Sequence, residues 1–402
     1  MIKLNAVSRN RIIYVCTIIF SILYIFIGNR ITSKGLSVFL GGENEAAVTA
    51  RVVSVSEKKE TEYRLSDTET HSGWELYFEA EITSGELKKS PVSAVQVSDP
   101  FHDTNVREVS PGDKILLIGT EEMEYPVPWL FLDYERFNSI IWLAVVFLLG
   151  LLIFGGVKGL NTIISLGFTC LSIFLVFIPA VLTGRNIYFW SITTCVYITL
   201  MTLLIVSGAN RKSLAACIGC FSGTLAASLT MLISDRFIKL TGMLNDESLY
   251  LMLMNPDKPI DLKAIIFASI IIGAIGAIMD VSISISSSLI EVRDTAKSIR
   301  ASSLFRSGLR IGRDIMGTMS NTLILAYIGS SLALVLLLVS YQASLRELLN
   351  RELIIVEILQ ALAGSLGILL TIPLNSAVCA ILYTRTRQPK KHVAEEPENG
   401  EE

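Results

Sequence analysis

The side chains of this sequence that could do chemistry lie within runs of apolar residues. Asp280 falls in the run 261–290, about 10 residues from its end, which is roughly 15 Å along a helix. A carboxylate at that depth in a bilayer costs at least ~2.5 kcal/mol and usually faces a partner or a water-filled cavity. We therefore predict that Asp280 marks a functional site inside a membrane.

Other small and polar residues share the helix face of Asp280. They recur at spacings of three and four, which is the repeat of one helix face. Glycines and hydroxyl residues also allow close helix packing in lipid, so their presence fits either solute contact or packing. Packing alone does not call for a charge. The members that we assign to the site or to its framework are Gly273, Gly276, Ser284 and Ser287.

The last apolar run, 353–383, carries a matching polar stripe. Pro373 lies within this run and removes one backbone donor, so we expect a broken helix there. The run should cross in the same direction as that of Asp280, with Asp280 level with Thr371 and Asn375. We predict that these side chains meet near mid-membrane and coordinate a cation or a polar solute. The stripe consists of Glu357, Gln360, Gly364, Gly367, Thr371, Asn375 and Cys379.

Hydropathy predicts a mainly α-helical, polytopic membrane protein. Apolar residues make up 51% of the 402-residue chain, and the mean hydropathy is +0.55. A helix of about 20 apolar residues crosses the ~30 Å hydrocarbon core of a bilayer. The sequence contains eight candidates, at 11–28, 139–155, 159–182, 187–207, 212–234, 261–290, 317–340 and 353–383.

The distribution of Lys and Arg predicts the orientation, because cytoplasmic loops carry an excess of both. With the N-terminus in the cytoplasm, the inner segments hold more than twice as many of these residues as the short outer loops. Both termini are therefore expected in the cytoplasm. The predicted parts are a signal-anchor helix 1–30, an extracytoplasmic domain 31–138, a seven-helix membrane domain 139–385 and a disordered cytoplasmic tail 386–402.

The extracytoplasmic segment has the pattern of β-strands. Apolar residues occupy every second position of 74–82, which is typical of a strand with one buried face. Further strands are expected at 48–55, 92–97 and 114–118. Four or five short strands without a cysteine predict a small all-β, OB-like barrel. It would bind a partner or a ligand, or simply support folding.

Composition and motifs exclude several classes of protein. A net charge of −3 provides no basic surface for nucleic acid. No histidine lies in a predicted span, which argues against an intramembrane zinc protease. Cys217 and Cys220 form a C-x-x-C pattern, but inside an apolar helix they fit packing better than redox chemistry. We expect no enzymatic activity and no cofactor, and the residues leave any metal undetermined.

Basic residues crowd the segment 291–316, between the sixth and seventh predicted spans. Because apolar residues alternate with them, the segment is expected to form a helix on the cytoplasmic leaflet. Arg313 and Asp314 would then open the seventh span, where the helix N-terminus favours the carboxylate. Arg313 is the most obvious ion-pair partner of Asp280. The pair can form only if the long side chain of Arg313 extends from the cytoplasmic start of the seventh span to Asp280.

Two stretches resemble the YibE/F family of bacterial multi-pass membrane proteins. They are GAIGAIMDV from Gly273 and SGLRIGRDIMGTMSNTLILAYIGS from Ser307. The resemblance covers roughly 140–385, and the anchor and outer domain are those of YibE-type members. It implies a location in the bacterial cell membrane. It also implies that four residues matter, without giving their roles: Asp280, Arg313, Asp314 and Asn321.

Three functions compete for these features. The first is a transporter or permease that moves an ion or small polar solute near Asp280, between the sixth and eighth spans. No Walker A motif occurs, so coupling would use an ion gradient or a separate subunit. The second is a non-transporting scaffold or sensor whose outer domain binds a partner. The third, an intramembrane enzyme, has only Asp280 and Glu357 as acids. Expected partners are the lipid bilayer, the solute, and a second copy or a paired membrane subunit.

Overall fold

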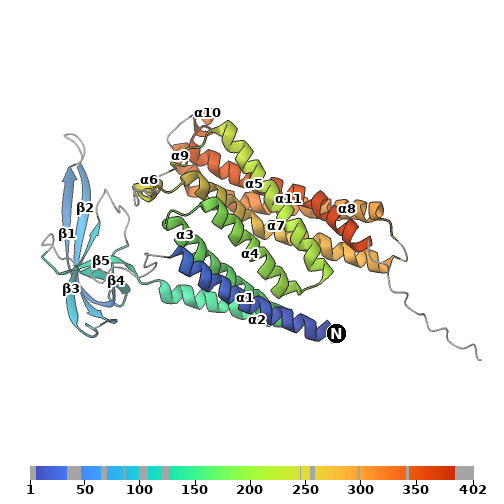
Figure 1. Cartoon of the computed structure of the whole chain (residues 1–402). Coiled ribbons are helices and arrows are strands. Elements are labelled where there is room, and N and C mark those ends of the chain that lie inside the picture. The colour runs from blue at the N-terminus through green and yellow to red at the C-terminus, as the bar shows by residue number, and fades with distance from the viewer. Residues whose placement is uncertain are drawn as a thin grey trace, which may run out of the picture. The chain divides into compact units, whose positions relative to one another are not determined.

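The structure is a computed structural model that describes residues 6–33, 47–64, 70–85, 87–98, 107–119, 126–244, 246–253, 259–296, 299–340 and 344–384. The predicted tail 386–402 lies outside the described residues. The chain divides into two compact units, shown in Figure 1. One is Ser37–Ile153, and the other joins Met1–Leu36 to Phe154–Glu402.

The smaller unit contains a closed β-barrel with the strand order β1-β2-β3-β5-β4. Leu76, Phe78 and Ala80 of β2 are buried, as their alternate spacing predicts. β4 pairs back to β1, and β3 and β5 run parallel, so the order fits an OB-like barrel. The predicted all-β domain is thus confirmed. The strands are β1 Val48–Arg64, β2 Thr70–Ile82, β3 Pro91–Ser98, β4 Lys114–Gly119 and β5 Trp129–Tyr134.

Helices form the larger unit, and α2 begins in the smaller one. Their bounds are α1 Ala6–Thr32, α2 Phe137–Ser172, the π-helix η1 Ile173–Phe177, α3 Ile178–Leu182, α4 Ile187–Ser207, α5 Arg211–Ile238, α6 Asp246–Leu253, α7 Leu262–Thr295, α8 Ala301–Ser330, α9 Leu332–Ser340, α10 Leu345–Leu348 and α11 Glu352–Thr384.

Six described helical stretches are long and apolar enough to cross a membrane. One of them, Phe137–Leu182, has 46 residues. Its length of about 70 Å is too great for a single crossing. Gly156 interrupts it with a φ of 52°, a left-handed conformation that glycine adopts at little cost. This break lies at the predicted junction of the second and third spans. The total of eight spans stays a prediction.

Polar contacts at one end of the bundle show the relative directions of α5, α7 and α11. The Nζ of Lys263 lies 3.6 Å from the Oδ1 of Asp235. The Oγ1 of Thr241 donates a 2.7 Å hydrogen bond to Glu352. Asp235 lies in the last turn of α5 and Thr241 just after it, and each contact leads to the start of another helix. As predicted for the sixth and eighth spans, α7 and α11 therefore share one direction, opposite to that of α5.

The core of the bundle is the packing of α5, α7 and α11, and small residues let these helices approach closely. A Cβ added to Gly219 would meet Asn375, and one added to Gly223 would meet Thr371. A Cβ on Gly367 would lie 3.0 Å from both Ala227 and Ile278. Packing is thus the role that the structure gives to the glycines on α5 and α11.

The prediction of a surface helix at 291–316 is wrong, because α7 extends to Thr295 and α8 is one helix from Ala301 to Ser330. A Cβ on Gly308 would meet Ser376, and one on Gly312 would meet Ile372. α8 therefore packs along α11 rather than across its end (Figure 1). Its small, buried side makes this packing possible, and the basic residues lie on the opposite side.

We expect the substitution Gly223→Ala to destabilise the bundle. The new methyl group would overlap Thr371, whose hydroxyl is held by a 2.6 Å hydrogen bond to the carbonyl of Gly367. Overpacking of this kind costs about 1–3 kcal/mol, measurable as the free energy of unfolding in detergent micelles. Gly167→Ala is the matched control, because nothing lies within 4 Å of its added Cβ. Equal stability of the two variants would contradict this packing.

Candidate functional site

Asn375 connects α11 to α7 in the interior of the bundle. Its side chain is fully buried, and its Nδ2 donates to the carbonyl of Ser282 at 2.8 Å and to the Oγ of Ser286 at 3.1 Å. The Oη of Tyr383 donates to the carbonyl of Ser286 at 3.1 Å. These hydrogen bonds pair the amide of Asn375 and the hydroxyl of Tyr383 with groups of α7 inside the protein, which a lipid environment favours. Neither Ser282, Ser286 nor Tyr383 was singled out from the sequence.

Two other predicted residues of α11, Thr371 and Pro373, also lie within its packing. Thr371 is buried and bonds to its own helix. Pro373 lies within α11, which continues as one helix from Glu352 to Thr384, so the predicted break is wrong. Close contacts with neighbouring helices let a membrane helix tolerate the donor that a proline lacks.

Asp280 does not join Thr371 and Asn375, so this part of the predicted site is wrong. Asp280 is exposed, whereas Ser282, which binds Asn375, is fully buried. Residues two apart on a helix point to nearly opposite sides, because each turn takes 3.6 residues. The predicted level of Asp280 relative to Thr371 and Asn375 is correct, since Ile278 lies beside Gly367 and Ser282 binds Asn375. Asp280 is therefore level with the stripe but faces away from it.

The neighbours of Asp280 along α7 form an open strip. Gly273 and Gly276 are exposed, and Ser284 and Ser287 are half-buried. The hydroxyl of Ser287 donates to the carbonyl of Ile283 at 2.7 Å, within its own helix. As predicted, these residues share the face of Asp280.

α8 carries a second exposed strip that is strongly polar. Arg313, Asp314 and Asn321 are exposed, while Leu304, Gly308 and Gly312 on the other side are buried. The prediction that Arg313 and Asp314 open a span is wrong, because both residues lie near the middle of α8. The exposed polar and small residues of this strip are Arg306, Arg310, Arg313, Asp314, Gly317, Thr318 and Asn321.

The two strips adjoin, because α8 packs on α7 as well as on α11. A Cβ added to Gly273 would meet the Oη of Tyr327. We call the combined surface the α7–α8 polar face. It comprises the α7 residues Gly273, Gly276, Asp280, Ser284 and Ser287 and the α8 residues Arg306, Arg310, Arg313, Asp314, Gly317, Thr318 and Asn321.

The polar face lies level with the middle of α11, one of the helices that are long and apolar enough to cross a membrane. α8 contacts α11 from Ser376, beside Gly308, to Gly364, beside Leu323. This stretch lies in the middle of α11, which is one of the helices able to cross a membrane. Arg313 and Asp314 follow directly after Gly312, which meets Ile372. Their charges therefore sit well inside the span of the bundle.

Three buried polar atoms near the face have no hydrogen-bond partner among the described residues. They are the Oη of Tyr327, the Oγ of Ser320 and the Oε2 of Glu357. Glu357 lies near the start of α11, and Tyr327 near the end of α8, so both belong to the end of the bundle at which α11 begins. Buried polar groups are rarely left unpaired. Of these three, only Glu357 was predicted, from its place in the α11 stripe.

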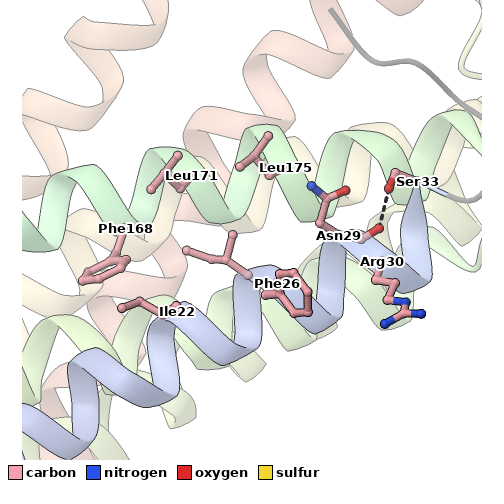
Figure 2. A pocket seen from close by; sticks show the side chains of 9 residues that line it. Ile22, Phe26, Asn29, Arg30, Ser33, Phe168, Leu171 and Leu175 are labelled. Atoms are coloured by element: carbon pink, nitrogen blue, oxygen red, sulfur yellow. Dashed lines mark hydrogen bonds between the residues drawn. The ribbon is translucent and has the colours of Figure 1, made fainter.

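Cavities occur elsewhere in the bundle. Figure 2 shows a mainly apolar groove of about 580 Å³ between α1 and the stretch that contains Phe168 and Leu175. Ile22 and Phe26 of α1 line it, together with Asn29 and Ser33, which are joined by a 2.6 Å hydrogen bond from the Oγ of Ser33 to the carbonyl of Asn29. The groove contains none of the predicted site residues.

The comparison with protein families confirms the resemblance noted in the sequence. The family model described as YibE/F-like protein matches residues 143–385. The chain therefore belongs to the YibE/F family. Neither a curated protein nor a solved structure matches it.

Replacing Asn375 by Ala should lower stability instead of acting only on function. The substitution removes two hydrogen bonds between α11 and α7, and such bonds contribute about 0.6–1.7 kcal/mol each in membrane proteins. The measurement is the free energy of unfolding in detergent. Asn321→Ala provides the control, since that side chain is exposed. A variant at position 375 that is as stable as the control would show that Asn375 does not hold the helices together.

Proposed function

We propose that the chain is a membrane permease that moves an ion or a small polar solute along the α7–α8 polar face. The observation that carries this proposal is the position of Asp280, Arg313 and Asp314 within the depth of the bundle and on its open side. Charges in this position are costly in lipid and are characteristic of solute pathways. A helix packed only for stability would not need them.

The residues along the face support a path through the membrane. Glu357 and Tyr327 lie toward the proposed outer end, and each has a buried oxygen with no hydrogen-bond partner in the described part of the chain. Ser320 has another, about two turns from Tyr327 along α8. Asp280 follows on α7. Oxygen atoms without partners are available to replace part of the hydration shell of a solute, so the arrangement suits a cation or a polar molecule.

The proposed location, orientation and energy source follow from the sequence patterns described above. The proposed location is the bacterial cell membrane, with both termini in the cytoplasm and residues 31–138 outside. No Walker A motif occurs in the sequence, so an ion gradient or a separate subunit would supply the energy. We propose no enzymatic activity.

A scaffold or sensor is the second candidate, and the barrel favours it. The β1–β2 hairpin is paired from Ala50 and Ile82 to Arg64 and Thr70, which is longer than the other strand pairs of this barrel. A long hairpin that extends from a small barrel is a suitable surface for binding a partner. This role would not require Asp280.

The substitution Asp280→Asn should reduce flux into proteoliposomes at least about tenfold, equivalent to ~1.4 kcal/mol in the transport barrier. The assay screens metal cations and amino acids with the wild-type chain and then compares variants on the solute that moves. The change removes a charge but keeps the shape, so folding should be unaffected.

Asp294→Asn is the matched control for this assay, because Asp294 is exposed at the inner end of α7, where Arg293 pairs with it at 2.7 Å. Its flux should equal that of the wild type. If Asp280→Asn transports as fast as Asp294→Asn, the proposed path is wrong. If the wild-type chain moves no solute in the screen, the scaffold becomes the better account.

A further inference from the structure

We propose that a second copy of this chain covers the α7–α8 polar face, so that the protein functions as a symmetric dimer. The charged side chains of this face must be shielded from lipid, and a partner that covers the face would do so. In the described part of the chain, Asp280, Arg313 and Asp314 form no ion pair. Unpaired charges at this depth cannot remain against hydrocarbon without a large cost.

The contrast with the rest of the bundle shows that the face is exceptional. On α5, the exposed positions at similar depth are apolar, among them Leu225, Leu229 and Leu232. An apolar surface of this kind can face lipid directly, so it does not require a protein partner. The exposed positions of α8 between Arg306 and Asn321 have the opposite character.

The adjacent charges of Arg313 and Asp314 fit a copy of the same face. Arg313 and Asp314 are adjacent, so they lie at nearly the same depth. A two-fold axis along the membrane normal would bring Arg313 of each copy to the level of Asp314 of the other copy. An interface of this kind is self-complementary, as a symmetric dimer requires. A partner of a single charge sign would leave one member of each pair unsatisfied.

Two glycines on the face provide the space for close contact. Among the residues that the structure describes, nothing lies within 4 Å of a Cβ added to Gly276 of α7 or Gly317 of α8. These glycines therefore do not serve packing inside one copy, in contrast to Gly223 and Gly219. Small residues at the surface of a membrane helix allow the backbone of a neighbouring helix to approach.

Cysteine cross-linking in native membranes tests the proposal. The background is the full chain with Cys16→Ser and Cys170→Ser, since these two cysteines are exposed and the other four are buried. Gly317→Cys and Asn321→Cys should each give a disulfide-linked dimer on oxidation. Leu225→Cys, on the apolar surface of α5, should not. Equal cross-linking at all three positions, or adducts only with another protein, would overturn the dimer.

A charge exchange provides a second test that does not depend on cysteine geometry. Arg313→Asp makes the pair wholly acidic and Asp314→Arg makes it wholly basic, and both residues are exposed in the single copy, so each variant should fold. With two differently tagged copies, self-association of either variant should fall at least about tenfold, because like charges would face each other. Co-expression of the two variants should restore pairing. Undiminished self-association of both, or no recovery in the mixture, would refute the interface.

Both tests measure association and not flux, so they separate this inference from the proposed function. A chain that pairs as expected but moves no solute would contradict only the permease. A chain that transports without pairing would contradict only the dimer.

Discussion

The cost of placing charge in hydrocarbon is the constraint on which the arrangement of this protein depends. α8 carries Arg306, Arg310, Arg313 and Asp314 on one side, yet it packs lengthwise against α11. Water is absent from the interior of a bilayer, so a helix of this kind needs protein, or a hydrated path, on its charged side. The proposed path and the proposed dimer are two consequences of this one requirement.

The rest of the bundle keeps α8 in that position. Small residues let α5, α7 and α11 pack closely, and the amide of Asn375 joins α11 to α7 through buried hydrogen bonds. Gly308 and Gly312 then allow α8 to lie against α11. A solid core on one side of α7 and α8 leaves their polar residues on the other side. The bundle therefore separates the residues that hold it together from those that could act on a solute.

Much of the fold could be predicted from the sequence, because long apolar runs and strict alternation have few structural meanings. The strands of the barrel, the common direction of α7 and α11 and the level of Asp280 relative to Thr371 and Asn375 all follow from such patterns. The face to which Asp280 points could not be predicted. Periodicity shows which residues of one helix share a side, but not which neighbour covers that side. Ser282 and Asn375 meet through a contact between two distant segments.

The wrong prediction of a surface helix at 291–316 has a different cause. The first half of α8 contains three arginines in the 301–313 stretch, and a hydropathy average treats such a segment as a loop or a surface helix. The glycines at 308 and 312 were the signal that pointed the other way, since two glycines four residues apart are a known means of close helix packing. The two glycines indicate close packing only once Ser376 and Ile372 are known to lie opposite them.

The central claim is that the charged side of α8 lies at membrane depth and is shielded from lipid. A nitroxide attached through Gly317→Cys, in the chain lacking Cys16 and Cys170, tests it by collision with dissolved oxygen and with a water-soluble nickel complex. A second label at Leu225→Cys reports a lipid-facing position. We predict that the label at position 317 collides with oxygen much less than the one at 225. Oxygen collisions as frequent as those at Leu225→Cys, or a depth at the lipid headgroups, would contradict the account.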